Sequence, residues 1–230
     1  MATLTPRTRL LLVLLSLGLC LGLAVTGWLI YRAQALPEVQ GVVMGRAAAM
    51  PEFTLTDHRQ EPFSNENLQG RWHLLTYGFT HCPDICPGTL AAMASVVRQL
   101  EQDGSPYDDL DLLFYTVDPE RDTASALADY VPFFHPRATG LTLNGHVYNR
   151  FEAFERSLGI VYEIPEFDRF GEPYPDDSYP VNHGVKVYLL NPGGRLQAVF
   201  EPAYSEHGMV HFSATTLLRD YLRVRQHLDG

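Results

Sequence analysis

Two cysteines, Cys82 and Cys86, are the side chains of this 230-residue chain whose type and spacing most directly suggest chemistry. They lie four positions apart, after an apolar run from Trp72 to Phe79. Thiols this close form either a redox pair or half of a site for a soft metal ion. A disulfide between them would close a very small loop and add little stability through chain entropy. The spacing therefore favours chemistry over a structural disulfide, and it leaves redox and metal binding both open.

A third donor for a metal site can come from the nine histidines of the chain. His183 stands out because it lies between the long segment 165–181, rich in proline and acidic residues, and an apolar strand candidate at 185–190. Two thiolates suit Cu(I), and an added imidazole would let the site also hold Cu(II). His81 adjoins Cys82, but neighbouring side chains point in different directions, so His183 is the stronger candidate.

The elements that must position these residues alternate between strands and helices, which predicts a mixed α/β sheet with right-handed crossovers. Cys86 falls at the expected start of a helix, where the helix dipole favours the thiolate and lowers its pKa. Open α/β sheets place their sites where a strand passes into a helix in this way. The order is typical of a thioredoxin-like domain, with a central mixed sheet flanked by helices. The expected strands are 53–55, 72–79, 110–117, 160–162, 184–190 and 195–200, and the expected helices are 88–102, 123–134, 147–158 and 213–227.

The N-terminal region contains an uncharged run of 21 residues from Leu10 to Ile30, preceded by Arg7 and Arg9. A helix of that length matches the thickness of a bilayer core, and the flanking arginines favour a cytoplasmic N-terminus. A cleaved signal peptide remains the alternative, although its apolar core is usually about 7–15 residues long. The expected organisation is a cytoplasmic N-terminus at 1–9, a transmembrane anchor at 10–31, a tether at 32–50 and a thioredoxin-like domain at 51–230.

The charge of the chain argues against one class of partner. The net charge is −10, and beyond residue 32 the chain carries 14 basic against 27 acidic side chains. Because such a surface repels phosphate, we expect no nucleic-acid partner. A cationic or metal-handling partner fits it better.

Three motifs of this sequence together resemble the Sco/SenC family, over roughly residues 50–228. The Cys loop combined with a distal histidine is the most specific part of that resemblance. The motifs are Tyr77-Gly78-Phe79-Thr80-His81-Cys82-Pro83-Asp84-Ile85-Cys86-Pro87, then Val117-Asp118-Pro119-Glu120-Arg121-Asp122-Thr123, then His183 followed by Val187-Tyr188-Leu189-Leu190-Asn191-Pro192-Gly193-Gly194.

The resemblance implies a membrane-tethered, thioredoxin-like copper chaperone that helps to assemble the dinuclear copper centre of cytochrome c oxidase. Cys82, Cys86 and His183 would be the copper ligands, for Cu(I) or Cu(II), and the two cysteines would also form a redox disulfide. No catalytic residue is implied. The partners would be the copper-bearing oxidase subunit or another copper chaperone. The expected location is the inner membrane, single-pass, with the C-terminal domain on the periplasmic side.

Two residues are expected around the ligands rather than on the metal, namely Asp118 and Asn182. The family commonly has aspartate immediately before the ligand histidine, where this chain has Asn182. Because a carboxylate beside a ligating imidazole raises its basicity, the asparagine predicts weaker Cu(II) retention. An enzyme remains the alternative function: a thiol–disulfide oxidoreductase that reduces the target's cysteines. Thioredoxin-type enzymes have two residues between their cysteines, whereas this chain has three.

Overall fold

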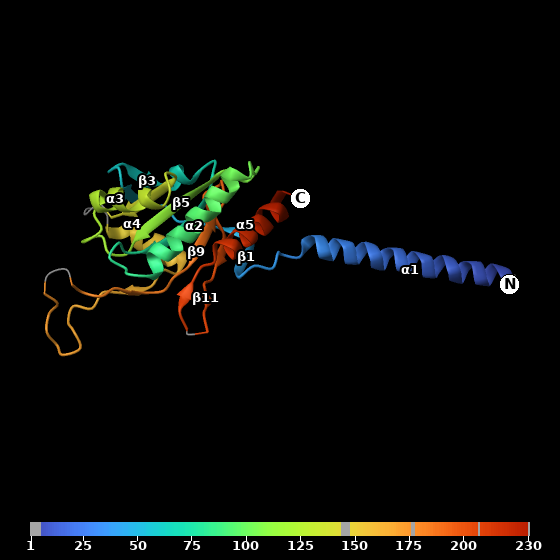
Figure 1. Cartoon of the computed structure of the whole chain (residues 1–230). Coiled ribbons are helices and arrows are strands. Elements are labelled where there is room, and N and C mark those ends of the chain that lie inside the picture. The colour runs from blue at the N-terminus through green and yellow to red at the C-terminus, as the bar shows by residue number, and fades with distance from the viewer. Residues whose placement is uncertain (1–5, 144–147, 176–177, 207, 230) are drawn as a thin grey trace. The chain divides into compact units, whose positions relative to one another are not determined.

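The computed structural model describes residues 6–143, 148–175, 178–206 and 208–229. The chain divides into two compact units, residues 1–37 and 38–230. Figure 1 shows the second unit as a sheet with helices on its two faces. Its helices are the short 3-10 helix η1 (Asn65–Leu68), α2 (Ile85–Gln102), α3 (Ala124–Phe134), α4 (Tyr148–Leu158) and α5 (Ala214–Asp229). Its strands are β1 (Gly41–Ala49), β2 (Thr54–Asp57), β3 (Pro62–Ser64), β4 (Trp72–Gly78), β5 (Leu110–Thr116), β6 (Ala138–Thr142), β7 (Tyr162–Glu163), β8 (Asn182–His183), β9 (Val187–Leu190), β10 (Arg195–Phe200), β11 (Ala203–Tyr204) and β12 (Val210–His211).

Eight strands form one mixed sheet in the order β1-β10-β9-β4-β5-β6-β2-β3. The neighbours β4, β5 and β6 run parallel, with Trp72 opposite Leu110. The strand β9 lies antiparallel on the other side of β4, with His73 opposite Leu190. This arrangement confirms the predicted α/β class with a central mixed sheet. Two further two-stranded sheets, β7-β8 and β11-β12, lie outside it.

Each face of the sheet has its own hydrophobic core. Side chains of α2, α3 and α5 cover one face, where Leu90, Leu127 and Tyr221 are fully buried against the strands. On the other face Phe154 of α4 packs with the aromatic ring of Phe53, 4.8 Å away between centroids. Because β4 and β5 contribute to both cores, they are apolar at nearly every position, as expected for central strands. This double burial fixes the end of β4, from which the Cys loop departs.

Local sequence signals explain several element boundaries. Thr123 caps α3, because its side chain accepts a hydrogen bond from the backbone amide of Ala126. The β9–β10 hairpin turns through Asn191, whose side-chain oxygen accepts hydrogen bonds from the amides of Gly193 and Arg195. Gly194 in this turn has a φ of 65°, which favours glycine. The hairpin and this helix start were both expected from the sequence.

The helix α1 (Pro6–Gln34) contains the 21-residue uncharged run. Many of its leucine side chains are exposed, with Leu15 and Leu21 at 68 % each. None of the helices in the described part of the chain is long and apolar enough to cross a membrane. The predicted transmembrane span is therefore not supported by the structure.

The segment predicted as a tether, residues 32–50, contains a strand of the sheet. Here β1 pairs antiparallel with β10, with Gly41 opposite Phe200 and Val43 opposite Ala198. The sequence gives little sign of this strand, because β1 is an edge strand and only Val43 among its residues is buried. The amide of Gln40 also donates to the carboxylate of Asp220 at 2.8 Å. The globular unit consequently begins about a dozen residues earlier than expected.

Candidate metal and thiol site

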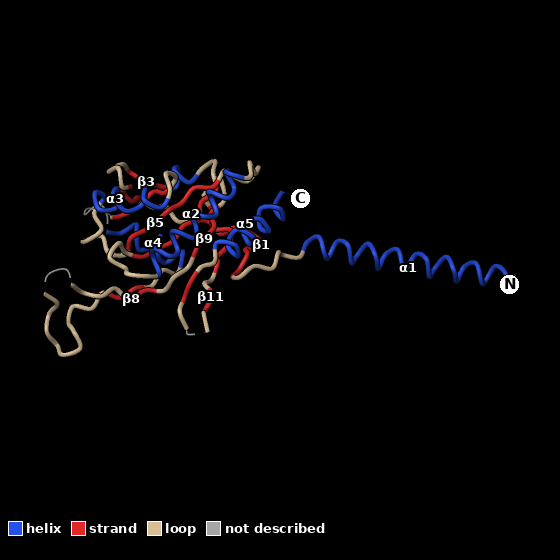
Figure 2. Tube along the Cα trace, viewed as in Figure 1, coloured by secondary structure: helices blue, strands red, loops and turns tan. Residues whose placement is uncertain are grey.

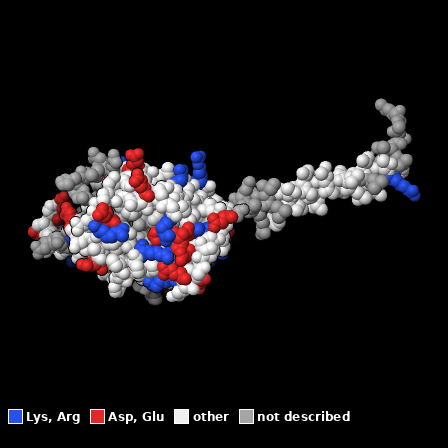
Figure 3. All heavy atoms as spheres, turned by 90° about the horizontal axis from the view of Figure 1, so that it is seen from above, with Lys and Arg blue, Asp and Glu red and all other residues white. Residues whose placement is uncertain are grey.

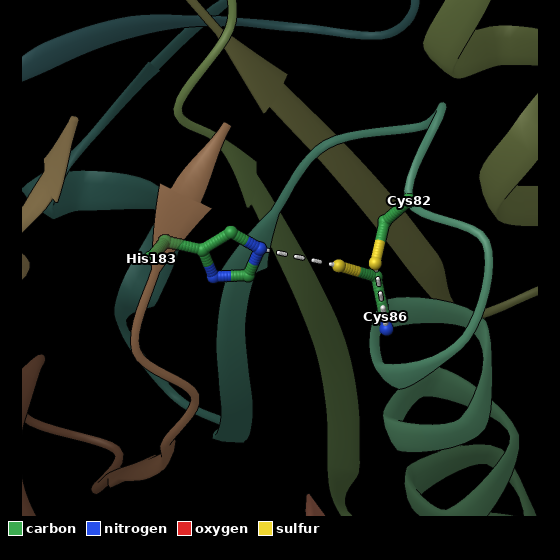
Figure 4. A group of neighbouring side chains, drawn as sticks. All are labelled: Cys82, Cys86 and His183. Atoms are coloured by element: carbon green, nitrogen blue, oxygen red, sulfur yellow. Dashed lines mark hydrogen bonds between the residues drawn. The ribbon is translucent and has the colours of Figure 1, made fainter. Parts of the chain in front are cut away.

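Three side chains from two distant segments converge on one point. The sulfurs of Cys82 and Cys86 and a ring nitrogen of His183 all lie within 4.8 Å of one another (Figure 4). Cys86 Sγ lies 3.6 Å from His183 Nε2. Cys82 and Cys86 are buried and His183 is half-buried. Among the described residues both cysteines are free thiols, so the structure is that of the reduced site.

The end of β4 and the first turn of α2 position the two sulfurs. The helix begins at Ile85, three residues earlier than the sequence indicated, so Pro87 lies inside its first turn. Proline is tolerated there because the first amides of a helix have no partner within the helix. The early start lets the amide of Cys86 donate to the sulfur of Cys82 at 3.5 Å. Gly78, the last residue of β4, leaves the space that the sulfur of Cys86 occupies, since a Cβ there would lie 2.5 Å from it.

The two thiols have opposite acidities. The hydrogen bond with Cys86 is the largest cause that lowers the pKa of Cys82, to about 3, and the backbone amides of Asp84 and Cys86 add to it. The same hydrogen bond, together with burial, raises the pKa of Cys86 above its ordinary value. The pair therefore shares one proton, with the charge on Cys82. The sequence predicted the lowered pKa at Cys86; the structure places it at Cys82, because that sulfur receives the hydrogen bonds at the helix N-terminus.

The imidazole of His183 is oriented for binding a metal through one nitrogen. Its Nδ1 lies 2.6 Å from the carbonyl oxygen of Gly184, which can only accept, so the proton is on Nδ1. Nε2 then carries the free electron pair that faces the thiols. Two aromatic rings flank the imidazole, Tyr77 at 5.8 Å and Phe79 at 5.7 Å between ring centroids. Such a hydrogen bond to the remote nitrogen is the usual way in which proteins set the tautomer of a ligating histidine.

The loop that carries Cys82 is fixed by the buried carboxylate of Asp122. It accepts hydrogen bonds from the amide of Thr80 at 2.8 Å, from the Thr80 hydroxyl at 2.5 Å and from the Thr116 hydroxyl at 2.6 Å. Burial raises the pKa of this carboxyl. The exposed ring of His81, the alternative ligand, instead contacts the Thr80 hydroxyl at 3.2 Å. The loop conformation is therefore anchored to the core through Asp122.

Asp118, expected near the ligands, lies in the loop after β5 and is fully buried. Its carboxylate forms an ion pair with Arg121 and accepts a hydrogen bond from the Tyr179 hydroxyl at 2.8 Å. Asn182, the other expected neighbour, is exposed in β8, where it pairs with Glu163. The remote nitrogen of His183 thus bonds to a backbone carbonyl, whereas the family pattern led us to consider the side chain at 182.

The donor set fits a soft metal ion. Two sulfurs, one with a pKa lowered to about 3, and an imidazole nitrogen are the ligands that Cu(I) and related ions prefer. Metal–ligand bonds of about 2.0–2.3 Å require trigonal donors roughly 4 Å apart, so small side-chain movements would close this site on an ion. The same free thiols, with one deprotonated, can also attack a disulfide. Geometry alone therefore permits both a metal site and a redox pair.

Several residues that shape the site were missed by reasoning from the sequence. Gly78 and Arg121 were not assigned roles at the site, and Asp122 was considered only as a helix cap. For Gly78, a glycine ending a continuous apolar run was an available signal, since such positions often mark a close approach. Tyr179 was expected to help order the segment 165–181 over the site, but its partners could not be predicted, because they are 58 and 61 residues away in the chain.

Comparison with known proteins agrees with this geometry. The family model described as SCO1/SenC matches residues 43–217, most of the chain. The mitochondrial SCO2 homolog of Bos taurus is 39% identical over 204 residues, covering 86% of this chain and 71% of its own length. A putative copper-binding protein of Stutzerimonas stutzeri is 34% identical over 166 residues, covering 72% of this chain and 76% of its own.

A solved structure is similar as well. The crystal structure of Arabidopsis thaliana ScoI with copper bound has a TM-score of 0.62 and 30% identity to this chain. The match covers 78% of this chain and 99% of the plant chain. Together with the mixed sheet and the Cys loop, this likeness confirms the predicted thioredoxin-like fold of the Sco type.

Proposed function

Because this chain belongs to the SCO1/SenC family, we propose that it binds one copper ion through Cys82, Cys86 and His183 and delivers it to cytochrome c oxidase. The recipient would be the copper-bearing subunit of the oxidase, or another copper chaperone in the same route. Copper is the cargo in this proposal. The chain's own residues supply donors that hold the ion and can release it one bond at a time.

The observation that carries the proposal is the convergence of three soft or borderline donors within 4.8 Å. His183 is 97 residues from Cys86 in the chain, so the meeting is a product of the fold. The lowered pKa of Cys82 favours its thiolate, and Nε2 of His183 faces the thiols while Nδ1 bonds to the Gly184 carbonyl. Metal affinity depends on such deprotonation, so the site is prepared for an ion.

The test is a copper titration of the reduced full chain carrying Cys20→Ser, which leaves only the two site thiols. We expect one copper per chain. His183→Ala should weaken Cu(II) binding by at least about 100-fold, the upper range for residues that merely support a ligand. The matched control is His211→Ala, which removes an exposed histidine of β12. Unchanged Cu(II) affinity in His183→Ala would overturn the three-ligand site.

A second function is favoured by the acidity of Cys82. The hydrogen bond from Cys86 lowers the pKa of Cys82 to about 3 and so favours its thiolate, as in redox-active cysteine pairs. Attack by this thiolate on a disulfide of the target would form a mixed disulfide, which the second thiol, Cys86, would resolve. One Cys82–Cys86 disulfide would form for each target disulfide reduced, so the two electrons balance. Such a step would prepare the target's cysteines to receive copper.

The redox function is tested by mixing copper-free reduced chain with a peptide that contains a disulfide. We expect stoichiometric reduction of the peptide with loss of both thiols, and a trapped mixed disulfide in Cys86→Ser. Absence of exchange in the wild type would overturn this function without touching the copper proposal. Catalytic turnover with an added reductant, in the absence of copper, would instead favour an enzyme.

We also propose that α1 attaches the chain to the inner membrane, with residues 38–229 on the periplasmic side. The proposal rests on the uncharged run and on exposed leucines along the helix, such as Leu14, Leu19 and Leu23 at 56–65 %. Figure 3 shows few charged side chains on the described part of α1, whereas acidic and basic side chains intermix on the other unit. A helix with apolar side chains on all sides requires an apolar environment.

Alkaline extraction of membranes tests the attachment. The wild-type chain should remain in the membrane pellet, and Leu19→Arg should shift part of it to the soluble fraction. A charge in the middle of a spanning helix costs about 2.5–3.5 kcal/mol by insertion measurements. Leu228→Arg, at an exposed position of α5, is the matched control. Recovery of the wild type in the soluble fraction would refute attachment.

A further inference from the structure

His183 lies in β8, at the end of the long segment that connects β7 to β8. Residues 164–181 connect β7 to β8 and are here called the arm; its described residues, 164–175 and 178–181, are drawn mostly as loop outside the sheet in Figure 2. The strand β8 has two residues and pairs only with the equally short β7. Two-stranded pairing of this length is weak support in water. Something else must therefore hold the returning end of the arm near the thiols.

Tyr179, four residues before His183, makes that connection through three different contacts. Its hydroxyl donates to Asp118 Oδ1 at 2.8 Å. Its carbonyl oxygen accepts a hydrogen bond from Arg121 Nη1 at 3.0 Å. The Arg121 guanidinium carbon also lies 3.9 Å from the centroid of the Tyr179 ring. Backbone, ring and hydroxyl of one residue are thus bound by a single pair of charged side chains.

That charged pair belongs to the rigid part of the molecule. Asp118 and Arg121 are joined by an ion pair with side-chain exposures of 1 % and 5 %. Asp118 lies in the loop that follows the buried strand β5, and its amide donates to the Thr116 hydroxyl. A buried ion pair is costly unless its remaining hydrogen-bonding capacity is used, and Tyr179 uses part of it on both partners. The contacts with the ion pair therefore require a tyrosine at position 179.

We propose that Tyr179 is a positioning residue for His183, and we call Tyr179, Asp118 and Arg121 the latch. The latch fixes the returning end of the arm, and Val181, which is 8 % exposed, packs in the core between the latch and His183. A second link runs through Phe79, whose ring lies 5.5 Å from the Arg121 guanidinium and 5.7 Å from the imidazole. This role rests on the proposed copper function, because it concerns the placement of one of the copper donors.

The latch should affect the two oxidation states of copper differently. Cu(I) is held chiefly by the two thiolates, which lie on the Cys loop and α2, whereas Cu(II) also needs the imidazole. Loosening the arm displaces the imidazole and leaves the sulfurs in place. Loss of Tyr179 contacts should consequently lower the Cu(II) affinity and leave the Cu(I) affinity nearly unchanged. A tyrosine that only stabilised the fold would move both affinities together.

The experiment measures Cu(I) and Cu(II) affinities of the full chain with competing chelators. Tyr179→Phe removes only the hydroxyl bond, and Tyr179→Leu also removes the ring beneath Arg121. We expect Cu(II) binding to weaken by about 10-fold and by up to about 100-fold respectively, the range found for groups that support a ligand. Cu(I) binding should change less than about 3-fold. Tyr174→Phe, in the same arm but outside the latch, is the matched control.

A double-mutant comparison makes the assignment to His183 strict. In a His183→Ala background, Tyr179→Phe should have no further effect on Cu(II) affinity, because the group that it positions is gone. In the copper-free protein, the ring signals of His183 in NMR spectra should broaden or shift in Tyr179→Phe and stay unchanged in Tyr174→Phe.

Equal losses of Cu(I) and Cu(II) affinity, or a full Tyr179→Phe effect in the His183→Ala background, would overturn the positioning role. So would wild-type affinities and ring signals in both Tyr179 variants. Failure of the wild type itself to bind copper would refute the proposed function instead. The two failures are therefore distinguishable in one set of titrations.

Discussion

The substitution Gly78→Ala should disable the site while leaving the fold in place. A Cβ at this position would lie 2.5 Å from the sulfur of Cys86, 3.4 Å from its Cβ and 3.5 Å from Cε2 of Phe114. The last two contacts are tolerable, but the first is not. Since ordinary contact with a sulfur needs well over 3 Å, the sulfur must move by about 1 Å or change rotamer. Either movement changes its position relative to His183 Nε2, its neighbour at 3.6 Å.

Two magnitudes follow from this displacement. Overpacking a buried position by one methyl group costs about 1–3 kcal/mol, which for a domain of this size lowers Tm by roughly 3–10 °C. Copper binding should fall by at least about 100-fold, since a ligand and not merely its support has been displaced. The assays are thermal unfolding of the copper-free chain and Cu(I) titration against a chromogenic chelator.

Two glycines serve as controls for this prediction. Gly88→Ala, in α2, adds a methyl group with nothing within 4 Å, so it should leave copper binding unchanged and stabilise the helix by about 1 kcal/mol. Gly140→Ala, in β6, places a Cβ 2.9 Å from Leu127 and should destabilise the fold without weakening copper binding. If Gly78→Ala binds copper within about 3-fold of the wild type, the close approach of Gly78 and Cys86 is not what positions the sulfur.

Three further predictions concern the same region. Because the pKa of Cys82 is lowered to about 3, thiolate absorbance near 240 nm should persist as the pH falls from 7 to about 4 and vanish in Cys82→Ser; absorbance that appears only above about pH 8 would contradict this. Asp122→Asn should destabilise the chain by about 2–3 kcal/mol in urea unfolding, because an amide has only one oxygen to accept the two Thr80 bonds and the Thr116 bond. Asp129→Asn, at an exposed position, is the control, and equal stabilities of the two variants would refute the anchoring role of Asp122. Asn182→Asp adds a negative charge beside His183, whose Nδ1 already bonds to the Gly184 carbonyl, so electrostatic attraction alone should tighten Cu(II) binding, by up to about 10-fold; equal Cu(II) affinities would remove any effect of this departure from the family.

The central sheet could be predicted because its buried strands are visible in the sequence as apolar runs. The runs Trp72–Gly78 and Leu110–Thr116 are buried on both faces and are accordingly almost continuously apolar. The edge strand β1 could not, because Gly41–Ala49 alternates only weakly and a single residue of it is buried. Its place depends on pairing with β10, more than 140 residues further along the chain. Local patterns carry no information about such pairing.

The thiols of the site could be identified from their spacing, and His183 from its position before an apolar strand and from the family resemblance. The division of charge between Cys82 and Cys86 could not, since it depends on where α2 begins. A start at Ile85 rather than Gly88 aims the Cys86 amide at the other sulfur. The contacts of Tyr179 were equally hidden, because they join the arm to a loop about 60 residues earlier.

The different origins of the three donors set the order in which a cargo would leave. Both sulfurs belong to the core of the globular unit, one in the first turn of α2 and one in a loop fastened by Asp122. The nitrogen donor, Nε2 of His183, belongs to the two-residue strand β8 at the end of the arm. A recipient that offers its own ligand would therefore displace the imidazole first and leave the ion on the two sulfurs. Release in this order would give the transfer a direction, because the donor on the two-residue strand has fewer contacts with the core than the two sulfurs.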